Sequence, residues 1–299
     1  MTALILYENS EINDILSISY PEGYDFEGKV AYLNEDIQVS VEQLLEFLLV
    51  YSANDSAYAT AIYISNSVED FVQLMNKRAE KLNMTNTNFK NPDGLDEAGH
   101  YTTLKDLLLL SKYILNNTKL IDITNKSKFY FDQSGTVKEY KNTNLIINDG
   151  FKGLKTGWTA DAGLTFIGYN QNLNRNIVTI VNKSFVDADK ESHFFDTLIL
   201  YQESLTNFID RTLLNNSENV YKIKSSNGSR LYSTQNDLSK FGNSNISTTL
   251  FLNDIDHASV KFTNNFDDEI FKISFMTSEN TTQYNFFMSN VISKLVLSD

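Results

Sequence analysis

Apolar residues change their spacing near Lys138, and this change limits the fold of the chain more than any other feature. Before Lys138 they recur every three or four residues, which is typical of helices that bury one face. After it, glycines separate short runs, and the runs at 164–169 and 177–181 predict a β-hairpin. Helices followed by antiparallel strands predict a mixed α/β fold of the α+β kind, with helices packed on an antiparallel sheet.

Two predicted helices surround a short polar turn in the first part of the chain. Ser40 and Gln43 have the form of a capping box, and the apolar run at 44–49 follows them, so we predict a buried helix there. A second helix should begin at Asn54 or Asp55, because both are good N-cap residues. The tripeptide at 52–54, Ser-Ala-Asn, is therefore expected on the turn between these helices.

The length of 299 residues favours one large domain and one smaller domain. A predicted helix from about 191 to 209 closes the first domain, to which we assign residues 1–209. Short alternating segments then predict a small all-β domain over 210–282. Residues 283–299 return to helical spacing and predict an amphipathic helix. It could pack on its own domain or lie on a membrane surface, and the single cation, Lys294, favours packing.

Composition excludes several classes of function. The net charge of -13 argues against nucleic-acid binding, which needs clustered basic residues. The absence of cysteine excludes thiolate catalysis and cysteine-ligated metals. His100, His193 and His257 lie far apart in the sequence, so we predict no metal site and no cofactor. Any catalysis must therefore use hydroxyl, amine and carboxylate groups.

Two short motifs together indicate a serine acyl-transfer site, although each alone is common. Ser52-Ala53-Asn54 precedes Lys155-Thr156-Gly157, which is the order of the second and third motifs of this chemistry. In it, Ser52 relays a proton to the leaving group, while the amide of Asn54 holds the substrate backbone and a nearby lysine. We predict Ser52, Asn54 and Lys155 as catalytic residues that face one cleft.

The Lys155-Thr156-Gly157 motif also predicts how a substrate binds. Lys155 brings positive charge to the proton relay and to the terminal carboxylate of a peptide, to which Thr156 donates a hydrogen bond. Gly157 lets the peptide lie against the strand as an added β-strand. Backbone N–H groups, one from the nucleophile and one near Thr159, would hold the oxyanion.

Four segments resemble the D-alanyl-D-alanine carboxypeptidase family of low-molecular-mass penicillin-binding proteins in order and spacing: NTNF (86–89), NPDGLD (91–96), GHYTT (99–103) and GLKTGWT (153–159). The resemblance extends from Met1 to about Leu205. It implies a serine β-lactamase/transpeptidase-like domain, a smaller β domain after it, and often a C-terminal amphipathic helix on the membrane. It also implies a serine enzyme that removes the terminal D-alanine from peptidoglycan stem peptides through an acyl-enzyme.

Partners and location follow from the same resemblance. They are a stem peptide ending in D-Ala-D-Ala, β-lactams as inhibitors of the full-length form, and an extracytoplasmic position in the periplasm or on the outer face of the cytoplasmic membrane. Residues 2–7 lack the cationic lead and cleavage site of a signal peptide.

The sequence departs from the family pattern at its start, because no S-x-x-K, the motif of the nucleophilic serine, occurs in it. In the family, Met-Thr-Ala-Leu typically follows this motif directly, so we expect the nucleophile, the export signal and the first strands upstream of Met1. Without them, we expect an inactive chain that folds poorly and exposes Leu4, Ile5 and Leu6. Two local departures, a segment without arginine at 142–145 and Lys190 in place of an expected arginine, predict a different strength of carboxylate binding.

Two other functions compete with this leading hypothesis. A non-catalytic cell-wall peptide-binding protein of the same fold would keep the binding groove without the nucleophile. A β-lactamase is disfavoured, because no glutamate is placed to activate a deacylating water.

Overall fold

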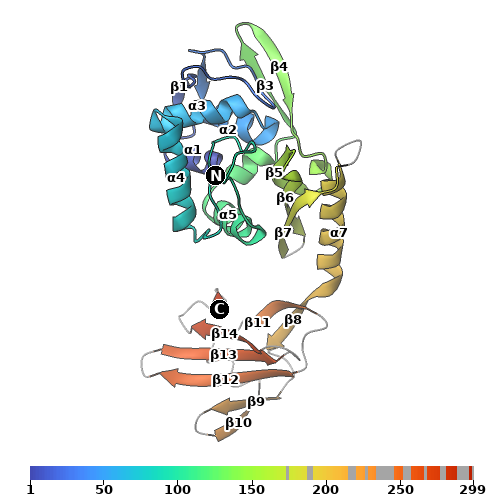
Figure 1. Cartoon of the computed structure of the whole chain (residues 1–299). Coiled ribbons are helices and arrows are strands. Elements are labelled where there is room, and N and C mark those ends of the chain that lie inside the picture. Colours follow the sequence, from blue (N-terminus) through green and yellow to red (C-terminus); the bar gives the residue numbers. More distant parts are fainter. Residues whose placement is uncertain are drawn as a thin grey trace. The chain divides into compact units, whose positions relative to one another are not determined.

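The computed structural model divides into two compact units, Met1–Tyr201 and Gln202–Asp299. It describes residues 1–172, 175–186 and 191–214 and, beyond these, the strands of the second unit; side chains are described for 1–171, 176–186 and 191–205. Figure 1 shows the elements of each unit. Lys190, which stands where the family resemblance leads us to expect an arginine, lies outside the described residues.

The first unit opens with a helical part. Its helices are α1 (Thr2–Glu8), α2 (Val41–Glu46), the π-helix η1 (Phe47–Tyr51), α3 (Asn54–Ser65), α4 (Val68–Lys81), α5 (Leu104–Asn117) and α6 (Leu120–Thr124). The capping box predicted at Ser40 and Gln43 is confirmed, with both reciprocal hydrogen bonds present. Ser67 and Thr103 cap α4 and α5 through their side chains.

Helix α1 forms the centre of the helical core, which corrects the expectation of exposed apolar residues there. Leu4, Ile5 and Leu6 are at most 1% exposed. Leu4 packs in a cluster with residues of α4 and α5, and Ile5 packs with residues of α3 and α4. Figure 1 shows α1 among these helices. The apolar face of α1 is therefore buried within the first unit.

The strands of the first unit form three antiparallel sheets. A three-stranded sheet has the order β5-β6-β7, with β5 at Phe151–Thr159, β6 at Gly163–Asn172 and β7 at Arg175–Ser184. β5 pairs with β6 alone among the described strands, so no described strand pairs with its other edge. The hairpin predicted at 164–181 is confirmed as β6 and β7, and α7 (Ser192–Asn207) confirms the helix predicted after it.

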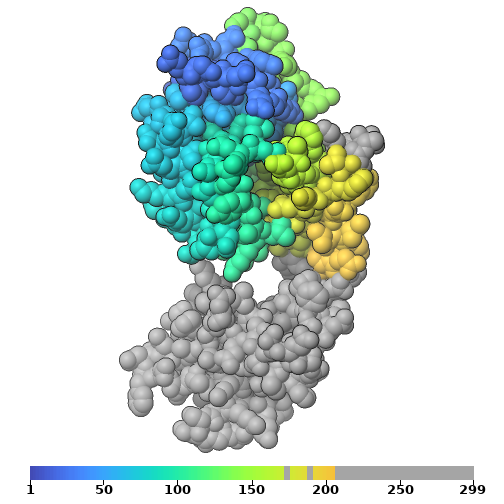
Figure 2. Space-filling view, viewed as in Figure 1, coloured from blue at the N-terminus to red at the C-terminus, as the bar shows by residue number. Residues whose placement is uncertain are grey.

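Two small sheets, β1 (Ile15–Ser17) with β2 (Gln38–Ser40) and β3 (Lys128–Gln133) with β4 (Thr136–Lys141), complete the unit together with the 3₁₀ turn η2 (Ile147–Asp149). In Figure 2 the loop between β1 and β2, in blue, lies at the top of the unit beside the β3–β4 hairpin, in light green. Phe47 of η1 packs edge-on against Phe129 and Phe131 of β3. The hairpin is thus part of the same core as the helices.

The described strands of the second unit form two sheets. One pairs β8 (Phe208–Leu214) with β11 (Ile246–Phe251). The other has the order β10-β9-β12-β13-β14-β15, formed by Gly228–Ser233, Val220–Ser225, His257–Asn265, Asp268–Met276, Thr281–Phe287 and Val296–Leu297. The all-β domain over 210–282 stays a prediction, because the residues between these strands lie outside those described. The helix predicted over 283–299 overlaps β14 and β15, and its other residues are likewise not described.

Within the described part of the chain, no helix is both long and apolar enough to cross a membrane. The same residues contain no cluster of three or more His, Asp and Glu side chains that could hold a metal ion.

Candidate active site

Ser52 lies on a sharp turn between two buried helical segments, where the sequence predicts it. The helix that begins with α2 widens into η1, which ends at Tyr51, and Ser52 then adopts a left-handed conformation with φ 65°. The N–H of Ala53 returns to the carbonyl of Phe47 at 2.9 Å, and α3 begins at the next residue. A positive φ at a residue other than glycine is a costly backbone state that is typical of functional turns.

Lys155 of the Lys-Thr-Gly motif contacts Ser52, which lies 103 residues earlier in the sequence. Its Nζ donates hydrogen bonds to Ser52 Oγ at 2.6 Å and to the carbonyl of Thr156 at 2.7 Å. Burial of the ammonium, and secondarily the charge of Lys29, lower the pKa of Lys155 from 10.5 to about 8. The structure therefore places a lysine that titrates near neutral pH in contact with the hydroxyl on the turn.

Asn54 is the third predicted residue, and it binds the loop between β1 and β2. Its backbone N–H donates to the carbonyl of Lys29 at 2.7 Å, and its Nδ2 donates to the carbonyl of Glu27 at 3.0 Å. Gly28, between these two carbonyls, has φ +71°, and a Cβ built on it would lie 2.5 Å from Asn54 Nδ2. A glycine is thus required for the loop to approach this amide so closely.

Asp55 corrects one expectation, because it does not cap α3. The N-cap residue is Ala53, and the carboxylate of Asp55 instead accepts the N–H groups of Ala31 at 3.0 Å and Leu33 at 3.2 Å. Asp55 is fully buried. Its carboxylate anchors the β1–β2 loop to the helix that carries Asn54.

Thr156, Gly157 and Thr159 continue along β5, an edge strand among those described. Thr156 Oγ1 donates to Thr143 Oγ1 at 2.6 Å. A Cβ on Gly157 would lie 2.6 Å from the hydroxyl of Thr165 on β6, so the strand pair is too close for a larger residue. Thr159 accepts the N–H of Ala162 at 3.1 Å, which closes the turn after the strand.

Two residues beside these motifs were missed from the sequence. Thr143 contacts Thr156 and ties the site to η1 through its N–H, which donates to the carbonyl of Val50 at 3.1 Å. Lys29 places its Nζ 4.2 Å from the ring centroid of Tyr51, and desolvation there lowers its pKa. Neither residue belongs to a sequence motif, so only the three-dimensional structure shows that they lie beside the site.

Helix α1 approaches the same site with its N-terminal end. Met1, which precedes α1, lies within electrostatic range of Lys155. Thr2 donates from its hydroxyl to the carbonyl of Pro92 at 2.6 Å, which joins α1 to the NPDGLD segment. The N-terminal end of α1 thus lies near Lys155 and contacts the NPDGLD segment.

Sequence comparisons relate most of the first unit to known proteins. The model of the family described as D-alanyl-D-alanine carboxypeptidase matches residues 1–185. The D-alanyl-D-alanine carboxypeptidase DacF of Bacillus subtilis (strain 168) is 27% identical over 208 residues, which are 69% of this chain and 53% of that protein. DacC of Escherichia coli (strain K12) is 32% identical over 155 residues, which are 51% of this chain and 38% of that protein. The chain spans about half the length of these relatives or less.

Solved structures establish the fold. Penicillin binding protein 6B from Escherichia coli superposes with a TM-score of 0.69 at 22% identity, covering 96% of this chain and 84% of that chain. Penicillin-Binding Protein D2 from Listeria monocytogenes, in its cefotaxime-bound form, gives a TM-score of 0.59 at 28% identity, covering 68% of this chain and 83% of that chain. Both share the mixed arrangement of helices and antiparallel strands seen here.

Proposed function

The chain belongs to the D-alanyl-D-alanine carboxypeptidase family, and from this premise we propose that its Ser52–Lys155 site serves the serine-type removal of the terminal D-alanine from peptidoglycan stem peptides. The observation that carries the proposal is the 2.6 Å contact between Lys155 Nζ and Ser52 Oγ, beside the edge of β5 that no described strand pairs with. Peptide and proton relay would meet at this point.

Ser52 and Lys155 supply the proton transfer of this reaction. With a pKa of about 8, Lys155 is largely protonated at neutral pH and donates to Ser52 Oγ. The hydroxyl proton of Ser52 is therefore directed away from the lysine and is available to the nitrogen of the departing D-alanine. A lysine with a pKa nearer to 10.5 would hold its own proton more tightly, and it would replace the proton that Ser52 gives away less readily.

The edge of β5 supports the binding of the peptide as an added strand. Lys155 offers an ammonium to the terminal carboxylate. The Thr156 hydroxyl, which donates to Thr143 in this structure, would turn its proton to that carboxylate when a peptide binds. The backbone near Thr159 remains the proposed second donor to the oxyanion.

The attacking hydroxyl belongs to the S-x-x-K motif in the family resemblance, and that motif does not occur in the 299 residues. The second candidate is a non-catalytic protein that binds cell-wall peptides through the same groups.

β-Lactam binding and an extracytoplasmic location are part of the proposal. The Listeria monocytogenes relative is known in cefotaxime-bound and ampicillin-bound forms. β-Lactams should accordingly compete with stem peptides for the Ser52–Lys155 site.

Calorimetric titration with two peptides that differ only in their last residue, Nα,Nε-diacetyl-L-Lys-D-Ala-D-Ala and its D-Ala-L-Ala diastereomer, tests the function. The proposal predicts saturable binding of the first peptide and at least tenfold weaker binding of the second, because the inverted centre moves the carboxylate away from Thr156. Equal binding of both, or of neither, would contradict it. Intact-mass measurement after incubation with a fluorescent penicillin separates the two candidates when it is made on a chain extended upstream of Met1 along its gene: a covalent adduct supports the carboxypeptidase, and reversible peptide binding without an adduct supports the binding protein.

A further inference from the structure

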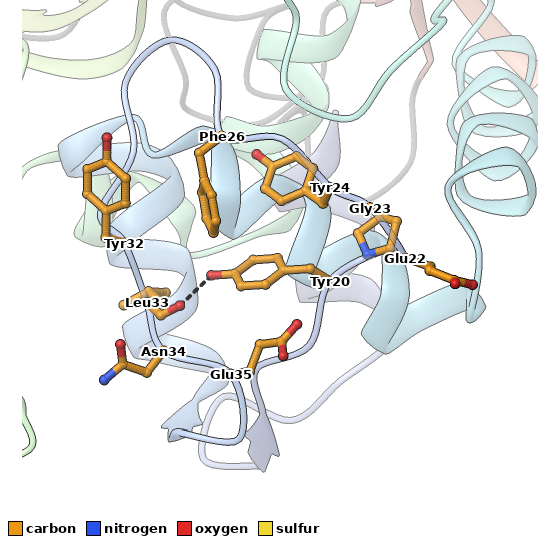
Figure 3. A pocket seen from close by; sticks show the side chains of 10 residues that line it. Tyr20, Glu22, Gly23, Tyr24, Phe26, Tyr32, Leu33, Asn34 and Glu35 are labelled. Atoms are coloured by element: carbon orange, nitrogen blue, oxygen red, sulfur yellow. Dashed lines mark hydrogen bonds between the residues drawn. The ribbon is translucent and has the colours of Figure 1, made fainter.

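A cavity of about 460 Å³ lies in the β1–β2 loop, outside the residues of the Ser52–Lys155 site. We call it the tyrosine cavity; it is lined by Tyr20, Pro21, Glu22, Gly23, Tyr24, Phe26, Tyr32, Leu33, Asn34 and Glu35. Figure 3 shows its four aromatic rings around one space, with Glu35 next to Tyr20. The family motifs do not include any of these residues.

The aromatic rings form a continuous wall. The ring centroids of Tyr20 and Tyr24 are 5.3 Å apart in a stacked arrangement, and Phe26 lies edge-on to Tyr20 at 5.3 Å. Tyr32 continues the wall at 5.6 Å from Phe26. Phe26 is 40% exposed and Tyr32 is 61% exposed, so the wall presents ring surface to solvent and is not a fully buried aromatic cluster.

The loop holds Tyr32 in a backbone conformation that aromatic residues rarely adopt. Its φ is 58°. Gln133 of β3 stabilises it from one side, donating to the carbonyl of Tyr32 at 3.1 Å and accepting the N–H of Asn34 at 3.3 Å. Asp55 binds the N–H groups on both sides of Tyr32. A strained residue held by contacts from two other elements points to a function for its exposed ring.

The charges around the tyrosine cavity are all negative. Glu22 and Glu35 line it, no lysine or arginine does, and neither carboxylate forms an ion pair with another described residue. Burial raises the pKa of the Tyr20 hydroxyl, and the carboxylates of Asp55 and Glu35 raise it further. A negative potential beside exposed aromatic faces favours a cation and disfavours an anion or a phosphate.

We propose that the tyrosine cavity is a binding site for an alkylammonium group. Glu35 pairs with the ammonium, and the rings of Tyr20, Phe26 and Tyr32 contact the ammonium and its methylene chain. The volume accommodates a chain of several carbons.

The position of the loop indicates where such a group comes from. The segment that continues from Phe26 supplies the carbonyls of Glu27 and Lys29 to Asn54. A peptide held at Asn54 therefore lies against the same loop, and an amino side chain on that peptide is the source that we assign. This source rests on the proposed function, whereas the ammonium site does not.

Nuclear magnetic resonance titration with n-pentylammonium tests the site without any peptide, and n-pentanol is the uncharged control. The proposal predicts saturable shifts of the Tyr20, Tyr24 and Tyr32 ring resonances with the cation only. Glu35→Gln removes the charge, and Tyr32→Asn removes the ring while keeping a residue that tolerates positive φ. Each should raise the dissociation constant by about two- to fivefold. Glu80→Gln and Tyr130→Asn, at exposed positions elsewhere, should leave it unchanged. Equal response to pentanol, or no effect of either cavity variant, would overturn the proposal.

The source is tested with Nα-acetyl-L-Lys-D-Ala-D-Ala and its Nε-acetylated form. Tighter binding of the free amine, lost in Glu35→Gln and Tyr32→Asn, supports the peptide side chain. Equal affinity of the two peptides overturns this source in favour of a separate amine. If neither peptide binds, the proposed function fails, and the pentylammonium titration still decides the tyrosine cavity.

Discussion

The Ser52–Lys155 site and the tyrosine cavity lie on two parts of one loop system, but their charges are opposite. Lys155 and Lys29 make the first cationic, and both have lowered pKa values because they are desolvated without a carboxylate partner. Glu22 and Glu35 make the second anionic. The β1–β2 loop separates them, with its Glu27 and Lys29 carbonyls turned to Asn54 and its aromatic rings turned to the cavity. A zwitterionic peptide could therefore place its carboxylate and its ammonium in separate, complementary surroundings.

Lys155→Met should have the largest effect on the cationic site. The loss of a charge-assisted hydrogen bond to the peptide carboxylate should raise the dissociation constant of a D-Ala-D-Ala peptide by about tenfold or more, measured by calorimetry. The fold should not suffer, because the variant removes a buried ammonium. Lys105→Met, at an exposed position on α5, is the matched control. An unchanged affinity in Lys155→Met would show that the carboxylate binds elsewhere.

The pH dependence of stability tests the charge of the buried Lys155 in the cationic site. The folded-state pKa of Lys155 is about 8 and its unfolded value is 10.5, so between these values the unfolded chain binds more protons. The free energy of unfolding should therefore rise with pH in this window, by about 2 kcal/mol between pH 7.5 and 9.5. Urea denaturation at several pH values measures it. Lys155→Met should lack most of the rise; a variant with the same slope would contradict the buried charge.

Gly28→Ala should disturb the loop where it approaches Asn54. The added Cβ would lie 2.5 Å from Asn54 Nδ2, whereas a Cβ on Gly23, which has nearly the same φ of +72°, meets nothing within 4 Å. Both substitutions carry the backbone penalty of positive φ, about 1 to 2 kcal/mol of unfolding free energy. Gly28→Ala should cost about 1 kcal/mol more and should also weaken peptide binding. Identical results for the two variants would argue against the close approach of the loop.

Gln133→Ala should produce the smallest effect, on the tyrosine cavity alone. It removes the two hydrogen bonds that hold Tyr32 and Asn34, which are exposed and together contribute about 1 kcal/mol. Pentylammonium should bind more weakly, while the D-Ala-D-Ala peptide should keep its affinity. Gln73→Ala on the exposed face of α4 is the control. A matching loss of peptide affinity would mean that the two regions are not independent.

Local sequence signals predicted the elements that carry the motifs. Caps at Ser40 and Thr103 fix helix starts through contacts three residues away, and glycines separate β6 from β7, so both can be recognised in sequence. The contact of Ser52 with Lys155 followed from the order of two motifs and the family resemblance, not from any local rule.

Long-range contacts account for what the sequence did not reveal. Asp55 has the sequence signature of an N-cap, but its carboxylate instead accepts hydrogen bonds from two N–H groups more than 20 residues away. Tyr32 depends on Gln133, about a hundred residues further along the chain. Leu4, Ile5 and Leu6 were expected at the surface, and only the packing of α3, α4 and α5 around α1 shows that they are buried.

The side-chain nitrogen of Lys155, observed by nuclear magnetic resonance in a pH titration, tests the central claim most directly. In the free chain the account predicts a pKa near 8. Saturation with Nα,Nε-diacetyl-L-Lys-D-Ala-D-Ala should raise this pKa, because a carboxylate beside the ammonium favours its charged form. A lysine that titrates near 10.5, or one whose pKa is the same with and without the peptide, would contradict the assignment of this site.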